Sequence, residues 1–142
     1  MPNTARAHWE GDLKSGKGTV ALGSGAFEGP YSFKSRFEGA PGTTPEELLG
    51  AAHAGCFTMA LSLGLTQAGH PATSLDTNAV VTLGKVGESF AITRIDLTLT
   101  GVVPGLSASE FQRLAEDAKK NCIISRAISN VPMTLEATLA PA

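Results

Sequence analysis

A long run without any charged side chain occupies the middle of this sequence. From Leu48 to Leu75 there is no Lys, Arg, Asp or Glu, and most residues are Leu, Ala, Gly, Phe or Met. A helix-start signal precedes the run, because Thr44 suits the N-cap, Pro45 the first helical position and Glu47 the matching place of a capping box. Since apolar residues cover nearly every side, the pattern predicts a helix that is buried all round.

Length alone would also allow this helix to cross a membrane, since residues 48–65 reach the usual minimum span of about 18 residues. Glycines and a histidine dilute the run, however, Glu46 and Glu47 stand at its start, and no cluster of Lys or Arg flanks it. The favoured prediction is therefore a central helix packed closely on its neighbours. Its small residues would let the same helix of a second subunit approach.

The whole chain has 142 residues, which predicts a single domain over residues 1–142. A net charge of −2 gives no reason to expect nucleic acid or an anionic membrane as partner. The N-terminus lacks the basic and apolar regions of a signal peptide, so a cytoplasmic location is expected. In that compartment two cysteines are more often reactive or simply buried than bridged.

Alternation and turn signals around the long helix predict an α+β chain in the order βββ-α-ββ-αα-β. The first two strands are expected at residues 5–10 and 19–22. A third strand is expected at residues 31–37, where aromatic residues alternate with polar ones and Arg36 falls on the polar face.

After the long helix, strands are expected at residues 75–83 and 90–103, joined by a glycine-containing loop at 84–88. Ser107 and Glu110 predict the start of a helix with Cys122 on its buried face. The remaining expected elements are a short helical turn at 123–129 and a closing strand at 133–139. The residues expected to face the core are Ile95, Leu97, Leu99, Phe111, Leu114, Ala115, Ala118, Met133, Leu135 and Leu139.

Cysteine is the residue type that offers chemistry here, since no Gly-rich phosphate loop follows a strand and no Ser sits in a nucleophile elbow. From composition alone, Cys56 and Cys122 are most simply core residues, because free Cys is among the most buried residue types. A metal site is a second option, with His53 one helical turn before Cys56 and Cys122 or His70 completing the set. Structural zinc sites, however, usually show paired Cys-x-x-Cys or spaced His pairs.

A family resemblance bears on these alternatives. The segment PEELLGAAHAGCF, with Arg36 before Cys56 and AKKNC after it, resembles the OsmC/Ohr family of organic hydroperoxide reductases. AHWEGDLKSGKGTV and SFKSRFEGAPGTTPEEL resemble its OsmC branch, so the resemblance covers essentially the whole chain. It implies that Cys56 attacks the peroxide, that Cys122 resolves, and that Arg36 and Glu46 position and activate the thiolate. Ile123 departs from the proline that often follows the second cysteine in this family.

The physical chemistry of thiols agrees with these roles. A thiol of ordinary pKa is only a few per cent thiolate at neutral pH, and the thiolate is the nucleophile. The dipole of its own helix helps Cys56 little, because Cys56 lies about three turns from the helix start. The Arg36 guanidinium, held by Glu46, is the expected source of the positive charge that lowers the pKa of the thiol. Glu46 and Cys56 would lie about 15 Å apart along an unbroken helix. The alternatives left open are a bend at Gly50 or Gly55, or a separate first turn.

The resemblance implies a thiol-dependent peroxidase for alkyl or lipid hydroperoxides, with a Cys56 sulfenic acid that Cys122 resolves as a disulfide. It further implies no metal, haem or flavin cofactor, a lipoyl-type dithiol as external reductant, and an intertwined homodimer. No nucleic acid or membrane partner is expected. The alternative from a different class is a non-catalytic stress-response binding protein in which the cysteines form a buried structural pair.

Overall fold

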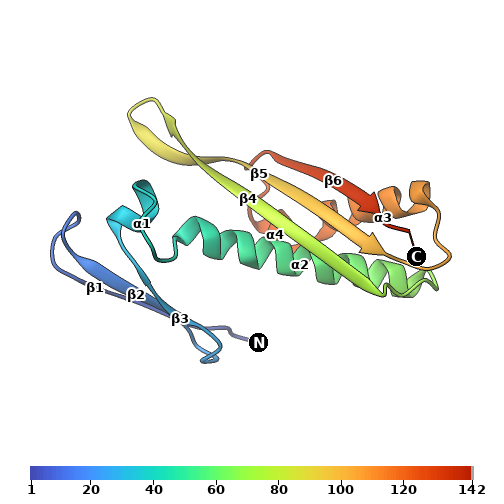
Figure 1. The fold of residues 1–142 in the computed structure, drawn as a ribbon, viewed down its shortest axis with the longest axis horizontal. Helices are drawn as coiled ribbons and strands as arrows, with labels where there is room; N and C mark the ends of the chain where they lie inside the picture. The colour runs from blue at the N-terminus through green and yellow to red at the C-terminus, as the bar shows by residue number, and fades with distance from the viewer. Residues whose placement is uncertain (142) are drawn as a thin grey trace. The chain divides into compact units, whose positions relative to one another are not determined.

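The computed structural model describes residues 1–141, and the chain divides into two compact units, Met1–Leu48 and Leu49–Ala142. Each unit holds one three-stranded sheet, as Figure 1 shows. The element order is βββ-αα-ββ-αα-β. The predicted α+β class is confirmed, with one more helix than the sequence pattern indicated.

The first sheet is an antiparallel meander of β1 (Ala5–Glu10), β2 (Lys17–Leu22) and β3 (Glu28–Tyr31). The bounds of β1 match the prediction, and β2 begins two residues earlier than expected. β3 begins three residues before the strand expected at residues 31–37 and ends at the first residue of that segment.

The predicted strand at residues 31–37 is wrong, because α1 (Phe33–Phe37) occupies most of it. The cause is a reciprocal capping box: the Ser32 hydroxyl accepts from the Ser35 N–H, and the Ser35 hydroxyl accepts from the Ser32 N–H, both at 2.9 Å. These bonds turn the chain into a helix despite the alternation of aromatic and polar residues. Arg36 therefore projects from a short helix, not from the polar face of a strand.

The long helix α2 (Pro45–Gln67) runs without a break, so its first turn is not separate. At its start the Thr44 hydroxyl accepts from the Glu47 N–H at 2.9 Å, as expected of an N-cap. The Glu47 carboxylate does not complete the predicted capping box, because it accepts from the Thr43 hydroxyl at 2.9 Å.

Only one face of α2 is buried in the single chain, so other elements of the same chain do not provide the predicted burial on every side. Phe57, Leu61 and Leu65 form a stripe with no exposed surface, whereas Met59 is 76% and Leu63 59% exposed. The hydropathy of a helix does not reveal which of its sides other elements cover. By length and composition alone α2 could also cross a membrane. Its buried stripe instead forms part of the core of a soluble domain.

The second sheet has β5 (Ser89–Val102) at its centre, antiparallel to β4 (Ser74–Val86) and parallel to β6 (Met133–Leu139). β4 extends past its predicted end, because Gly87, at a φ of +64°, makes a tight turn where a longer loop was expected. The parallel pairing of β5 with β6 requires the intervening helices to carry the chain back along the sheet.

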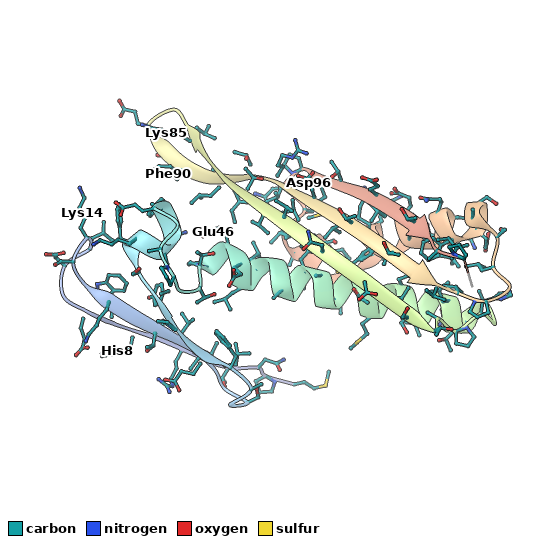
Figure 2. The ribbon with its side chains drawn as sticks, in the orientation of Figure 1. His8, Lys14, Glu46, Lys85, Phe90 and Asp96 are labelled. Atoms are coloured by element: carbon teal, nitrogen blue, oxygen red, sulfur yellow. The ribbon has the colours of Figure 1, made fainter. Side chains whose placement is uncertain are left out.

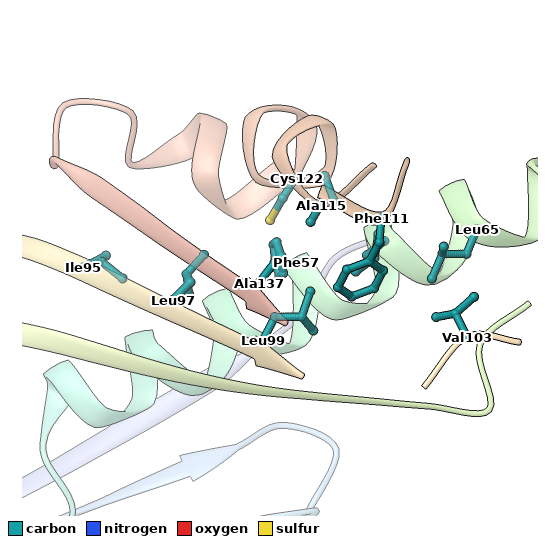
Figure 3. Close-up of a cluster of buried hydrophobic side chains, with 12 residues drawn as sticks. Phe57, Leu65, Ile95, Leu97, Leu99, Val103, Phe111, Ala115, Cys122 and Ala137 are labelled. Carbon is teal, nitrogen blue, oxygen red and sulfur yellow. The ribbon is translucent and has the colours of Figure 1, made fainter. Parts of the chain in front are cut away.

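The helices α3 (Ala108–Asn121) and α4 (Ile123–Ala127) form that connection. The Ser107 hydroxyl caps α3 by accepting from the Glu110 N–H at 3.2 Å. Figure 3 shows side chains of α2, β5 and α3 meeting in one cluster. A Cβ at Gly101 would lie 2.7 Å from the Phe111 ring, so this glycine lets the ring pack directly on β5. Most of the predicted core is confirmed as buried, namely Ile95, Leu97, Leu99, Phe111, Ala115, Ala118 and Cys122.

Candidate active site

The unit Leu49–Ala142 brings both free cysteines together. Cys56 lies in the middle of α2 and is partly exposed. Cys122 lies at the junction of α3 and α4 and is only 1% exposed, with its sulfur directed into the core cluster of Figure 3. The two thiols lie close enough that each shifts the pKa of the other. Their contact places a partly accessible sulfur directly against a buried one.

A cavity of about 910 Å³ opens beside these two sulfurs. It lies between α2 and α3, and its wall is mostly apolar, with contributions from Met59, Ala60, Leu63, Leu114 and Ile123. Arg113 also lines it, but this guanidinium is bonded to the carboxylates of Glu110 and Asp117. A cavity of this size and polarity suits an organic molecule better than a small hydrophilic one.

The surroundings of the two thiols favour charge on Cys122 over charge on Cys56. Burial raises the pKa of Cys56, and the Cys122 thiol raises it further, while the backbone N–H groups of Ile124 and Ile123 oppose this. Burial also acts to raise the pKa of Cys122. The Cys56 thiol, the N–H and hydroxyl of Ser125 and the Ile124 N–H outweigh that burial, so the pKa of Cys122 is lowered.

The start of α4 thus supplies donors that the sequence argument did not consider. The influences expected on Cys56 were the Arg36 guanidinium and, only weakly, the dipole of α2, whereas the first N–H groups of any helix lack partners within the helix. At α4 two such groups act on Cys56. One of them belongs to Ile123, and proline in its place would have no N–H to offer. The predicted helical turn directly after Cys122 was the signal from which these donors could have been inferred.

In the unit Met1–Leu48, Arg36 and Glu46 form the ion pair that was predicted between them. The Arg36 Nε lies 3.0 and 3.2 Å from the two carboxylate oxygens of Glu46, and Nη2 lies 2.5 Å from Oε1. Glu46 stands in the first turn of α2 (Figure 2) and is nearly buried, whereas Arg36 is more exposed. A bidentate, charge-assisted pair of this kind fixes the orientation of a guanidinium. The action of this pair on Cys56 stays a prediction.

His53 has a different partner from those of the metal-site alternative. Its Nε2 lies 2.7 Å from the Ser125 hydroxyl, and both residues are buried. Burial lowers the pKa of His53. Within residues 1–141 no group of three or more His, Cys, Asp or Glu side chains is arranged to hold a metal ion. Sequence reasoning missed Ser125, whose polar role becomes visible only when α4 packs on α2.

Comparison with known proteins shows the family of the chain. Residues 37–136 match the family described as OsmC-like protein. Over 124 residues, 87% of each chain, the sequence is 54% identical to the peroxiredoxin OsmC of Escherichia coli strain K12. The chain belongs to the OsmC-like family.

Solved structures of this OsmC-like fold are similar over nearly the whole chain. The organic hydroperoxide resistance protein OhrB of Bacillus subtilis superimposes with a TM-score of 0.71 at 25% identity, covering 95% of this chain and 98% of that one. An OsmC-like protein of Vibrio cholerae superimposes with a TM-score of 0.77 at 19% identity, covering 96% and 99%. The names of these relatives support a peroxidase or redox role, and the predicted family resemblance is confirmed.

Proposed function

We propose that this OsmC-like protein is a cysteine-based peroxidase that reduces organic hydroperoxides to alcohols. The observation that carries the proposal is the contact of a partly exposed Cys56 with a buried Cys122 beside an apolar cavity. A purely structural cysteine pair needs neither a cavity nor access from solvent. The relatives named peroxiredoxin OsmC and organic hydroperoxide resistance protein OhrB support the same class of reaction.

In the first step the Cys56 thiolate attacks the terminal oxygen of the hydroperoxide. The O–O bond breaks, the hydroxyl group is transferred to sulfur as a sulfenic acid, and the alkoxide takes a proton and leaves as the alcohol. The apolar wall of the cavity binds the organic part of the substrate, which favours alkyl and lipid hydroperoxides over hydrogen peroxide.

In the second step the Cys122 sulfur attacks the sulfur of the Cys56 sulfenic acid. The S–O bond breaks, the disulfide forms, and the departing hydroxide takes the Cys122 proton to leave as water. An external dithiol, for which we propose a lipoyl-type compound, then reduces the disulfide by thiol–disulfide exchange.

Arg36 and Glu46 serve the first step in this proposal. Burial and the neighbouring thiol raise the pKa of Cys56, so a cation is needed to make it a thiolate at neutral pH. Arg36 is the proposed cation, and Glu46 holds it through Nε and Nη2, which leaves Nη1 outside the pair.

The working form in this proposal is a homodimer. Met59 and Leu63 leave an apolar strip of α2 exposed, and the small residues Ala51, Ala52 and Gly55 are exposed on the same helix. Small side chains allow two helices to approach closely, so a second copy of α2 would cover this surface. Light scattering after size exclusion would test this, and a monomer at micromolar concentration would contradict it.

A stoichiometric oxidation tests the chemistry. We expect one equivalent of cumene hydroperoxide to remove both free thiols of the reduced protein and to produce a disulfide between Cys56 and Cys122 by mass spectrometry. Cys56→Ser should consume no peroxide while keeping its circular dichroism spectrum. Retention of both thiols in the wild type would favour the alternative, a binding protein with structural cysteines.

A further inference from the structure

Two buried polar side chains beside the cysteines have no task in the chemistry above. His53 is 0% and Ser125 5% exposed, and they are bonded to each other across the core at 2.7 Å. His53 lies one helical turn before Cys56 on α2, and Ser125 lies one turn after Cys122 in α4. Two neighbouring interactions therefore join α2 to the start of α4: the two thiols shift each other's pKa, and the imidazole is hydrogen-bonded to the hydroxyl.

The environment of His53 fixes the direction of its hydrogen bond. Its Nδ1 is buried and has no hydrogen-bond partner among residues 1–141. A proton on Nδ1 would leave a buried N–H unpaired, which is rarer than an under-used acceptor. Burial also lowers the pKa of the ring and keeps it neutral. The single proton of the neutral ring therefore sits on Nε2 and is donated to the Ser125 oxygen.

This direction leaves the Ser125 hydroxyl hydrogen available for another acceptor. The neighbouring acceptor is the sulfur of Cys122, one turn before Ser125 at the start of α4, and the hydroxyl and N–H of Ser125 both lower its pKa. A hydroxyl that donates to sulfur favours the thiolate, and the thiolate is the form that attacks.

We propose that His53 and Ser125 are positioning residues for the resolving step, in which they hold the Cys122 sulfur as a hydrogen-bond acceptor facing oxidised Cys56. The inference rests on the proposed function. His53 and Ser125 keep their protons throughout. The proton released from Cys122 leaves with the hydroxide of the sulfenic acid, as water. Because they act only on Cys122, their removal slows disulfide formation and spares peroxide attack.

Single-turnover kinetics of the reduced full-length protein separate the two steps. The protein is mixed with cumene hydroperoxide, trapped with dimedone to follow the sulfenic acid, and quenched with acid to follow the disulfide. In Ser125→Ala and His53→Leu we expect disulfide formation about tenfold slower, as for loss of one hydrogen bond to a charged group. Sulfenic acid formation should stay within about twofold of wild type, since neither residue is among the groups that shift the pKa of Cys56. His53→Gln can offer an N–H near the position of Nε2 and should restore most of the rate.

Thr58→Val is the matched control. It removes a side-chain hydroxyl of α2 that is bonded to Thr77 at 2.6 Å, away from the His53–Ser125 pair, and it should leave both steps unchanged. Circular dichroism of each variant checks that it folds. If His53→Leu does not fold, Ser125→Ala, which is the smaller change, carries the test.

If the wild type forms the disulfide and the variants form it equally fast, the inference is overturned and the proposed function stays intact. Equal slowing of both steps, or failure of His53→Gln to recover, would also overturn it, because either result indicates a packing role alone. Wild-type protein that consumes peroxide without forming a disulfide would overturn the resolving role of Cys122 and this inference with it.

Discussion

Ile123→Pro tests whether the start of α4 contributes to the reactivity of Cys56. Ile123 is the first residue of α4, where an N–H has no partner within the helix and proline is well tolerated. The preceding residue, Cys122, has a ψ of 131°, which is the extended conformation that proline requires of its neighbour. The substitution therefore removes one N–H that acts on Cys56 while α4 keeps its backbone.

The expected magnitude follows from the loss of that donor. Hydrogen bonds to charged groups contribute about 1.5–3 kcal/mol, and an N–H bond to sulfur is weaker, so we take about 1 kcal/mol. This corresponds to about a fivefold smaller thiolate fraction at pH values below the pKa of Cys56. The pKa of Cys56 is raised further, because a group that favoured the charged form is gone. The difference disappears at high pH, where both proteins are fully ionised.

The assay is the rate of Cys56 alkylation by iodoacetamide against pH, read from the Cys56 peptide by mass spectrometry. Cys122 is 1% exposed, so the reagent reaches Cys56 first. Ile123→Ala is the control, since it keeps the N–H and removes only a side chain from the cavity wall. Superimposable curves for Ile123→Pro and wild type would refute the role of this N–H. Equal shifts in the proline and alanine variants would instead assign the effect to the side chain.

Three further substitutions test the role of Arg36, the role of Cys122 and the packing of the core. Arg36→Lys loses the planar fork and should slow peroxide reduction at least about tenfold. Its free energy of unfolding in denaturant should change by no more than about 1 kcal/mol. An unchanged rate of peroxide reduction would remove Arg36 from the site. Cys122→Ser should form the sulfenic acid once and then over-oxidise, which mass spectrometry would detect as added oxygens; clean repeated turnover would contradict the resolving role. Phe57→Ala should cost about 3–5 kcal/mol in urea unfolding, because the ring is fully buried, and a loss under about 1 kcal/mol would contradict that packing.

Much of the fold was predictable because hydropathy and turn residues act locally. The bounds of β1 and β6 and the alternation of β5 agree with expectation. The segment at residues 31–37 was predicted to be a strand and is mostly helical. The hydrogen bonds between Ser32 and Ser35 determine its conformation more strongly than its alternation of aromatic and polar residues does. The burial of α2 was over-predicted because a uniformly apolar helix carries no information on which face its neighbours cover.

The candidate site was predictable only where side-chain identity carries the chemistry. Cys56 and Cys122 were expected together because the sequence resembled a family with two reactive cysteines. The bond between His53 and Ser125 was not expected, since it joins residues 72 positions apart that no motif connects. The N–H groups of α4 were missed for a different reason: backbone donors belong to every residue and become specific only through geometry.

The opposite shifts of the two thiols fit a reaction in which each cysteine acts at a different time. In the reduced pair the local donors favour charge on Cys122, and the pKa of Cys56 is raised, so peroxide attack requires a cation such as the one proposed for Arg36. Once Cys56 has become a sulfenic acid it no longer competes for charge. The Ser125 and Ile124 donors still favour charge on Cys122 at that stage, and the second step needs a thiolate facing a neutral sulfur. In the proposed mechanism the Ser125 hydroxyl therefore serves mainly disulfide formation, whereas the first N–H groups of α4 also act on Cys56. Arg36 and Glu46 serve peroxide attack in the proposed mechanism. Loss of Arg36 or Glu46 should therefore slow peroxide attack and spare disulfide formation, and loss of the Ser125 hydroxyl should have the opposite effect.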